Sequence, residues 1–206
     1  MNQLIEKIKK LKRLPISKTV DQRLKEFKEL GKKGNDDWFC ELGFCILTAN
    51  SRASTALAIQ DELGIDGFLR KSKEGICDCI KKNKHRFHNN KARYIVEARR
   101  FRNIKDILKK EKNQREWLVK NIKGLGWKES SHFLRNVGCI DYAILDRHII
   151  RLMHEQGYIN QMPKSLSKDS YLVIEIKFKE IAKELNMSCA ELDLYMWYIK
   201  TGKVLK

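Results

Sequence analysis

The sequence predicts an all-α protein of roughly ten helices, because apolar residues recur at helical spacing along most of the chain. Only two prolines, Pro15 and Pro163, interrupt its 206 residues. Few segments alternate between apolar and polar residues with the period of two that half-buried strands show. A helical fold joined by short connections is therefore expected along the whole chain.

The N-terminal helices are indicated by apolar stripes and by capping residues. One stripe runs through Leu4, Ile5, Ile8 and Leu11, and a second through Val20, Leu24, Phe27 and Leu30. Asn35 or Asp36 is suited to cap a third helix, since both residue types are favoured at that position.

The remaining helices are bounded by glycines and by changes in polarity. An alanine-rich segment, Ser54–Leu63, is expected to end at Gly64, because glycine favours the backbone conformation that closes a helix. Further helices are expected over residues 74–81, 89–101, 104–110, 114–122, 128–137, 147–155, 166–185 and 188–199.

Two glycine-containing breaks suggest how the helices group. The breaks lie near residues 31–34 and 138–141. We expect residues 1–34 to pack with a C-terminal lobe formed by residues 139–206. Residues 35–138 are expected to form a helical barrel lobe that ends in a helix-hairpin-helix.

The charge balance points to a polyanionic partner. The chain carries 43 Lys and Arg against 26 Asp and Glu, a formal net charge of +17. Such an excess favours nucleic acid as the partner, although a basic surface that only aids solubility is the alternative.

Nothing in the sequence indicates a membrane or secreted protein. No run of about eighteen apolar residues exists, and residues 1–12 are too charged for a signal peptide. The six cysteines are scattered without CxxC spacing, which indicates reduced thiols inside a cell. We therefore expect an intracellular protein with no membrane association.

The segment Asn121–Lys128 predicts a tight turn between two helices. Gly124 and Gly126 are one residue apart, so that successive backbone N–H groups can form a concavity that suits a phosphate oxygen. Leu125 is placed to turn inward, and Lys123 adds positive charge. The device would bind phosphate without reading bases. The alternative is an ordinary helical hairpin that uses its glycines only for turning.

Lys128 and Asp146 are the candidate catalytic pair. An amine held beside a DNA strand can form an imine with a deoxyribose, provided that it is neutral for part of the time. Asp146 opens a predicted helix, where a carboxylate is favoured by the helix dipole and can stabilise positive charge on a sugar. A plain helix cap is the alternative role for Asp146.

The order of these motifs resembles a known family. Lys123–Lys128 followed by Ile144–His148 is similar to the helix-hairpin-helix and aspartate signature of base-excision DNA glycosylases. Further stretches resemble the archaeal-type 8-oxoguanine DNA glycosylase/AP lyases of that superfamily: Leu47–Asn50, His85–Phe87, Lys91–Val96, Ser131–Gly138 and Leu192–Lys206. The resemblance covers the chain from roughly Trp38 to its end.

The resemblance implies two helical lobes with an active cleft between them, and it assigns roles to individual residues. Lys128 would be the Schiff-base lysine and Asp146 the catalytic aspartate. Phe87, Trp197 and Lys206 would form the pocket for a flipped purine, and Asn50 would enter the gap left by the extruded base. The expected DNA-binding residues are Asn50, Lys123, Gly124, Gly126, Arg147 and His148.

The resulting hypothesis is a bifunctional repair enzyme that removes 8-oxoguanine through a lysine imine and then cleaves the strand by β-elimination. Its expected partner is double-stranded DNA with an oxidised purine, bound by a monomer. This chemistry requires no redox cofactor and no catalytic metal. Two alternatives are a glycosylase for another base lesion and a non-catalytic helix-hairpin-helix module that binds nucleic acid.

Overall fold

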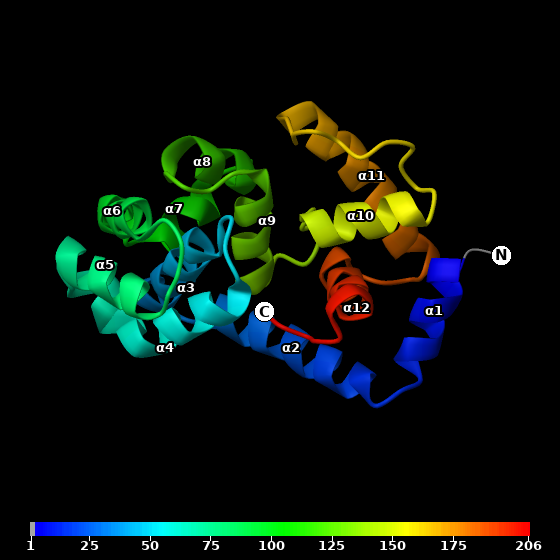
Figure 1. Cartoon of the computed structure of the whole chain (residues 1–206), viewed down its shortest axis with the longest axis horizontal. Helices are drawn as coiled ribbons and strands as arrows, with labels where there is room; N and C mark the ends of the chain where they lie inside the picture. Colours follow the sequence, from blue (N-terminus) through cyan, green and yellow to red (C-terminus); the bar gives the residue numbers. More distant parts are fainter. Residues whose placement is uncertain (1–2) are drawn as a thin grey trace. The chain divides into compact units, whose positions relative to one another are not determined.

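A computed structural model describes residues 3–206, and within that range every regular element is a helix (Figure 1). The predicted all-α class is therefore confirmed. The α-helices are α1 (Gln3–Lys12), α2 (Ile16–Lys32), α3 (Asn35–Thr48), α4 (Ala53–Arg70), α5 (Lys73–Lys82), α6 (His88–Ala98), α7 (Ile104–Lys110), α8 (Gln114–Asn121), α9 (Trp127–Asn136), α10 (Arg147–Glu155), α11 (Lys168–Glu184) and α12 (Cys189–Thr201), and a 3-10 turn, η1 (Arg99–Phe101), follows α6.

Serine and asparagine caps fix where several helices begin. The side chains of Ser72, Asn113, Ser167 and Ser188 each accept a backbone N–H from the first turn of α5, α8, α11 and α12. Each such bond satisfies an amide that has no partner within its own helix. These caps explain why the helices start immediately after polar residues.

The predicted cap of α3 is corrected by the structure. Asn35 is the first residue of α3, and Gly34 takes the cap position without a side-chain bond. The Asn35 carboxamide oxygen instead accepts the backbone N–H of Lys105, at 2.9 Å, and its amide group donates to Asp106. Asn35 therefore ties the start of α7 to the start of α3.

The helix that was expected to end at Gly64 is longer than predicted. Gly64 has φ 56° and ψ −174°, which are not helical values, but the helix resumes beyond this kink and reaches Arg70. Glycine tolerates this conformation because it has no Cβ. The sequence thus predicted where the helix is interrupted, but not that it continues to Arg70.

Residues 30–133 form one compact unit. Its central element is α3, which packs against α4, α6 and α7 and is buried from Trp38 to Thr48 except at Cys40. Gly43 allows the ring of Phe68 to approach closely, because a Cβ at this position would lie 2.3 Å from the ring. This unit contains the predicted hairpin.

Residues 1–29 and 134–206 form the other compact unit, so that the first and last segments of the chain belong together. Within it, α12 packs against α1, α10 and α11. A buried ion pair joins Arg135 to Asp193 at 2.6 Å, and the guanidinium also lies over the ring of Phe27. No helix in the described part of the chain is long and apolar enough to span a membrane.

Candidate active site

The predicted hairpin is present between α8 and α9. Leu125 is 5% exposed, which confirms that it turns inward. Gly124 has φ +89°, and a Cβ there would lie 2.7 Å from the Tyr94 ring, so the turn needs glycine for both its conformation and its space. Gly126 is exposed, but its N–H donates to the Glu129 carboxylate at 3.3 Å. That amide already has a carboxylate partner, which a DNA phosphate would have to replace.

The start of α9 is held from α8. The guanidinium of Arg115 lies 4.6 Å from the centroid of the Trp127 ring, and it donates to Ser131 Oγ at 3.2 Å. Arg115 is itself buried. Arg115 thus contacts Trp127 and Ser131, which precede and follow Lys128 in the sequence, and these contacts fix the first turn of α9.

Lys128 is partly buried and paired. Its Nζ lies 2.8 Å from Glu129 Oε1, and the two side chains are 24% and 14% exposed. The second carboxylate oxygen of Glu129 accepts the Gly126 N–H. A single carboxylate therefore links the glycine turn to the lysine amine. Sequence reasoning missed Glu129, although a glutamate three residues after the cap position of a helix is a known capping signal.

Lys123 lies on the exposed surface of the hairpin. Its Nζ forms an ion pair with Glu97 of α6 at 3.0 Å. The hydrogen bond from Lys123 lowers the pKa of the Glu97 carboxyl. Lys123 was predicted to contact DNA, and in this arrangement a phosphate would compete with Glu97 for its amine.

Asp146 occupies the cap position of α10. Its Oδ1 accepts the backbone N–H groups of His148 and Ile149, at 2.8 and 2.9 Å. Among the described residues, no group bonds Oδ2, so one oxygen of the carboxylate serves the helix and the other is available. The capping role left open by the sequence is therefore real.

The extended segment before Asp146 is fixed by α11. Tyr171 donates from its hydroxyl to the Ala143 carbonyl at 2.7 Å and accepts the Leu145 N–H. Glu175 accepts the Ala143 N–H at 3.1 Å. Both side chains are buried, so Asp146 projects from a rigid base.

Trp197 of α12 and His148 of α10 lie in contact. Their ring centroids are 5.1 Å apart with an interplanar angle of 85°, an edge-to-face geometry. The indole N–H of Trp197 is buried and has no hydrogen-bond partner within residues 3–206. Arg147 is exposed beside them, and Lys206 lies in the partly buried tail that follows Gly202.

Phe87 is an exposed aromatic residue in an unusual backbone conformation. It is 47% exposed, has φ 60° and occupies the cap position of α6. The left-handed region is disfavoured for a bulky side chain, so the surrounding structure must hold it there. Arg86 lies 4.8 Å from the centroid of its ring. A large apolar face is therefore presented to solvent at a fixed position.

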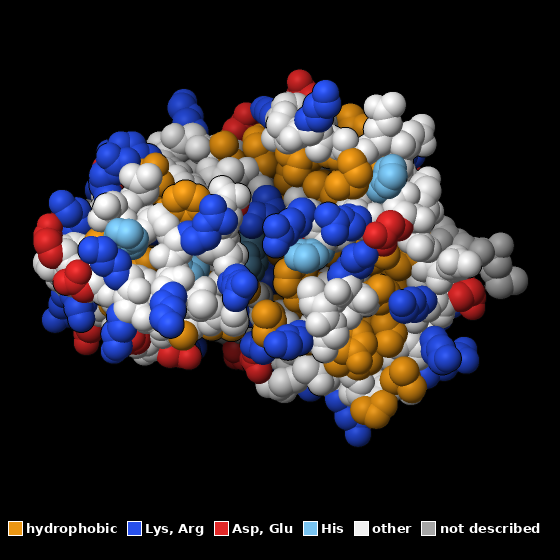
Figure 2. Space-filling view, in the orientation of Figure 1, with side chains coloured by type: hydrophobic (Ala, Val, Ile, Leu, Met, Phe, Trp, Pro, Cys, Tyr) orange, Lys and Arg blue, Asp and Glu red, His pale blue; other side chains and the backbone are white. Residues whose placement is uncertain are grey.

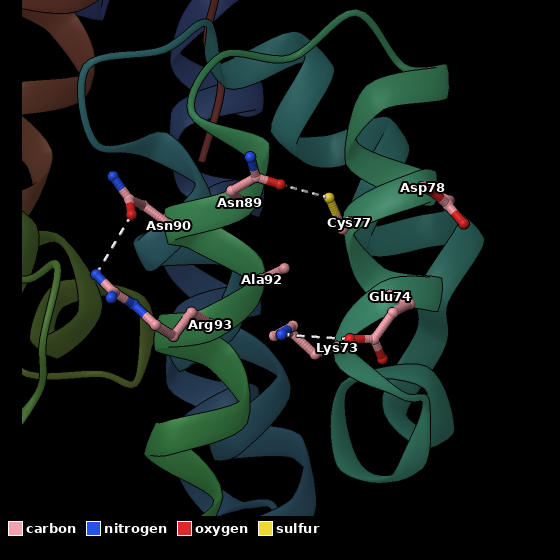
Figure 3. Close-up of a pocket in the computed structure, with 8 residues that line it drawn as sticks. All are labelled: Lys73, Glu74, Cys77, Asp78, Asn89, Asn90, Ala92 and Arg93. Atoms are coloured by element: carbon pink, nitrogen blue, oxygen red, sulfur yellow. Dashed lines mark hydrogen bonds and ion pairs between the residues drawn. The ribbon is translucent and has the colours of Figure 1, made fainter.

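A groove between α5 and α6 is a separate feature of the same unit. It encloses about 420 Å³ and is lined by Lys73, Glu74, Cys77, Asp78, Asn89, Asn90, Ala92 and Arg93 (Figure 3). The Cys77 thiol donates to the Asn89 carboxamide oxygen across it. None of the predicted site residues lines this groove.

Basic side chains outnumber acidic ones over the visible face of the molecule (Figure 2). This agrees with the net charge of +17 and with a polyanionic partner. Within the described part of the chain, no three His, Cys, Asp or Glu side chains are placed to hold a metal ion together.

Comparison with known proteins gives consistent matches. Residues 20–187 match the family model Ogg-HhH, described as 8-oxoguanine DNA glycosylase. An 8-oxoguanine DNA glycosylase/AP lyase of Methanocaldococcus jannaschii is 52% identical, over 98% of this chain and 99% of the relative. The protein of the same name from Korarchaeum cryptofilum is 41% identical, over 100% and 99% of the two chains.

A solved structure matches equally well. The crystal structure of the Methanocaldococcus jannaschii 8-oxoguanine glycosylase/lyase in complex with a 15mer DNA containing 8-oxoguanine superimposes with a TM-score of 0.95. The two sequences are 51% identical, and the match covers 98% of this chain and 99% of the other.

Proposed function

Because the chain belongs to the 8-oxoguanine DNA glycosylase family, we propose that it removes 8-oxoguanine from duplex DNA and then cleaves the strand through an imine on Lys128. The observation that carries this proposal is the near-complete match, in sequence and in structure, to a glycosylase/lyase solved with DNA that contains the lesion. Lys128 in the first turn of α9 supplies the amine that the chemistry requires.

In the proposed reaction, the neutral Lys128 amine attacks C1′ of the lesion nucleotide. The C1′–N9 bond breaks, the electron pair leaves with the base, and the base takes up a proton. Ring opening gives an imine between Nζ and C1′, which acidifies the C2′ hydrogens. Loss of a C2′ proton then expels the 3′ phosphate by β-elimination. Before the reaction, Glu129 pairs with the Lys128 amine and positions it at the start of α9.

Asp146 is assigned an electrostatic role. As the C1′–N9 bond breaks, positive charge develops on the sugar, and an ionised carboxylate stabilises it. The hydrogen bonding of the Asp146 carboxylate supports this role, because Oδ1 accepts N–H groups from the start of α10 and Oδ2 does not. The rigid segment held by Tyr171 and Glu175 would keep the carboxylate in place.

Phe87, Trp197 and Lys206 are proposed to contact the extruded base. A purine that leaves the helix loses its stacking, and aromatic faces restore part of it. The exposed ring of Phe87 and the packed ring of Trp197 support this assignment. Asn50 is proposed to enter the vacated gap, and the backbone is proposed to be held by Lys123, Gly124, Gly126, Arg147 and His148.

The proposal is tested by incising labelled duplexes that carry 8-oxoguanine, another oxidised base or no lesion. Preferential cleavage at 8-oxoguanine supports it. Equal or faster cleavage at a different lesion would identify a glycosylase of other specificity, and binding without any cleavage would identify a non-catalytic module. That the protein acts as a monomer stays a prediction, which light scattering with and without duplex can test.

A further inference from the structure

The connection between α3 and α4 is a tight turn built around Asn50. Ala49 has φ −56° and ψ 118°, and Asn50 has φ 52°, which are the angles of a type II turn. The Ser51 N–H donates to the Thr48 carbonyl at 3.2 Å and closes the turn. Asparagine tolerates the left-handed position better than most residues do. The exposed Asn50 therefore sits at the tip of a defined turn.

A buried lysine lies under this turn. Lys91 of α6 is 3% exposed, and its Nζ donates to Leu47 O at 2.5 Å and to Ser51 Oγ at 2.6 Å. It also lies 3.0 Å from His85 Nε2. Both acceptors of the ammonium, Leu47 O and Ser51 Oγ, belong to the segment at the Asn50 turn.

His85 extends the network to the far end of the turn. Its Nδ1 lies 2.5 Å from Thr55 Oγ1, and the Thr55 hydroxyl donates to the Arg52 carbonyl at 3.0 Å. On the other side of the ring, Nε2 lies within hydrogen-bonding distance of both Leu47 O, at 2.8 Å, and Lys91 Nζ, at 3.0 Å. The chain of bonds runs from Leu47, before the turn, to Arg52, after it.

The same two residues flank Phe87. His85 precedes it by two positions, and Lys91 donates its backbone N–H to the Phe87 carbonyl at 3.0 Å. Both side chains converge on the Leu47 carbonyl, which His85 Nε2 approaches to 2.8 Å. The Phe87 loop, residues 83–87 between α5 and α6, and the Asn50 turn are therefore both attached to the Leu47 carbonyl.

We propose that Lys91 is a positioning residue, which fixes the Asn50 turn and the Phe87 loop relative to each other so that the lesion strand is bound in its extruded form. This inference rests on the proposed function. It adds to that function a group that touches neither the base nor the sugar and acts only through Ser51, Leu47 and His85.

The charge on Lys91 is held at an energetic cost. Burial lowers its pKa to about 8, the charges of Lys128 and Arg86 act in the same direction, and Glu129 opposes them. The pKa of His85 is also lowered, chiefly by burial. Since unfolded lysine titrates near its ordinary value, the charged form opposes folding below about pH 8, and the opposition fades as the pH rises further. A lysine kept at this cost indicates a use other than stability.

Deprotonation of Lys91 would weaken the network. A neutral amine can still donate to Leu47 O and Ser51 Oγ, but both hydrogen bonds lose the charge that strengthens them. The two anchors of the Asn50 turn would therefore hold it less firmly.

The test compares affinities for two duplexes, one undamaged and one with a single tetrahydrofuran abasic analogue, measured by fluorescence anisotropy. The ratio of the two affinities reports how well the protein holds an extruded site, because loss of one positive charge weakens both complexes alike. Lys91→Met is the main variant. Lys109→Met, which removes an exposed lysine of α7, is the charge-matched control.

We expect Lys91→Met to lower the affinity ratio about tenfold, the effect of one lost charge-assisted hydrogen bond. Its thermal midpoint at pH 7 should equal or exceed that of the wild type, because a buried charge is removed. Between pH 7 and 9 the wild-type ratio should fall while that of Lys91→Met stays flat. Ser51→Ala, at a half-buried position, should lower the ratio in the same direction without unfolding the core.

An unchanged ratio in both Lys91→Met and Ser51→Ala would overturn the proposal. So would a Lys91→Met protein whose ratio and thermal midpoint fall together while Ser51→Ala behaves as wild type, since Lys91 would then be only structural. Failure of the proposed function is distinguishable, because the wild type itself would then show no cleavage of the 8-oxoguanine duplex.

Discussion

The amine of Lys128 and the carboxylate of Glu129 lie 2.8 Å apart, although the two residues are adjacent in sequence. Neighbouring side chains on a helix normally diverge, because successive positions are separated by about 100° around its axis. Here the second oxygen of Glu129 is turned back to the Gly126 N–H, which brings the carboxylate over the start of the helix. The hairpin turn and the proposed nucleophile are therefore connected through one side chain.

Replacing Glu129 by glutamine should show how the Lys128–Glu129 ion pair affects the reaction rate, independently of the affinity for DNA. Glutamine can still accept the Gly126 N–H but no longer forms an ion pair with Lys128. We expect the single-turnover rate on the 8-oxoguanine duplex to fall about tenfold, while duplex affinity stays equal or improves because a negative charge is removed. Glu180→Gln, on the exposed surface of α11, is the matched control. An unaltered rate would show that the carboxylate is dispensable.

Two substitutions of Asp146 should separate its capping role from its electrostatic role. Asparagine is also a good cap, so Asp146→Asn should keep the thermal midpoint while base excision falls by about two orders of magnitude. Asp146→Ala should lose excision and also about 1 kcal/mol of unfolding free energy. The measurements are single-turnover excision and thermal unfolding. Near-normal excision by Asp146→Asn would leave Asp146 as a cap alone.

Gly124→Ala should destabilise the hairpin. The new Cβ would meet the Tyr94 ring at 2.7 Å while the backbone has φ +89°. We expect a loss of about 1–3 kcal/mol in unfolding free energy together with weaker duplex binding. Gly157→Ala is the control, because Gly157 has φ +75° but no atom within 4 Å of the added Cβ. Equal losses in the two variants would mean that backbone strain, and not the close approach of Tyr94, decides the effect.

The sequence was sufficient for features that depend on local pattern. Apolar spacing predicted the helices, and the Gly124–Gly126 pair with Leu125 between them predicted the hairpin and its inward leucine. The kink at Gly64 was located, but not the continuation of α4 beyond it, because packing of the second half decides whether a helix resumes.

Contacts between segments that are far apart in the chain could not be predicted from the sequence. Asn35 is a residue type that favours the cap position of a helix. Its side chain accepts a backbone N–H from the start of α7, which begins some seventy residues later in the chain. In the sequence, Lys91 and His85 appeared only as members of the stretches that resemble the glycosylase family. Their shared contact with Leu47 requires the packing of α6 on α3, which no spacing within either segment reveals.

Imine formation on Lys128 is tested most directly by sodium borohydride trapping on a labelled duplex with one 8-oxoguanine opposite cytosine, beside undamaged and abasic duplexes. We expect a covalent protein–DNA adduct on the lesion duplex and its loss in Lys128→Gln, which should still bind that duplex. An adduct that persists in Lys128→Gln would contradict the assignment of Lys128. The absence of any adduct from the wild-type protein on every duplex would contradict imine chemistry altogether.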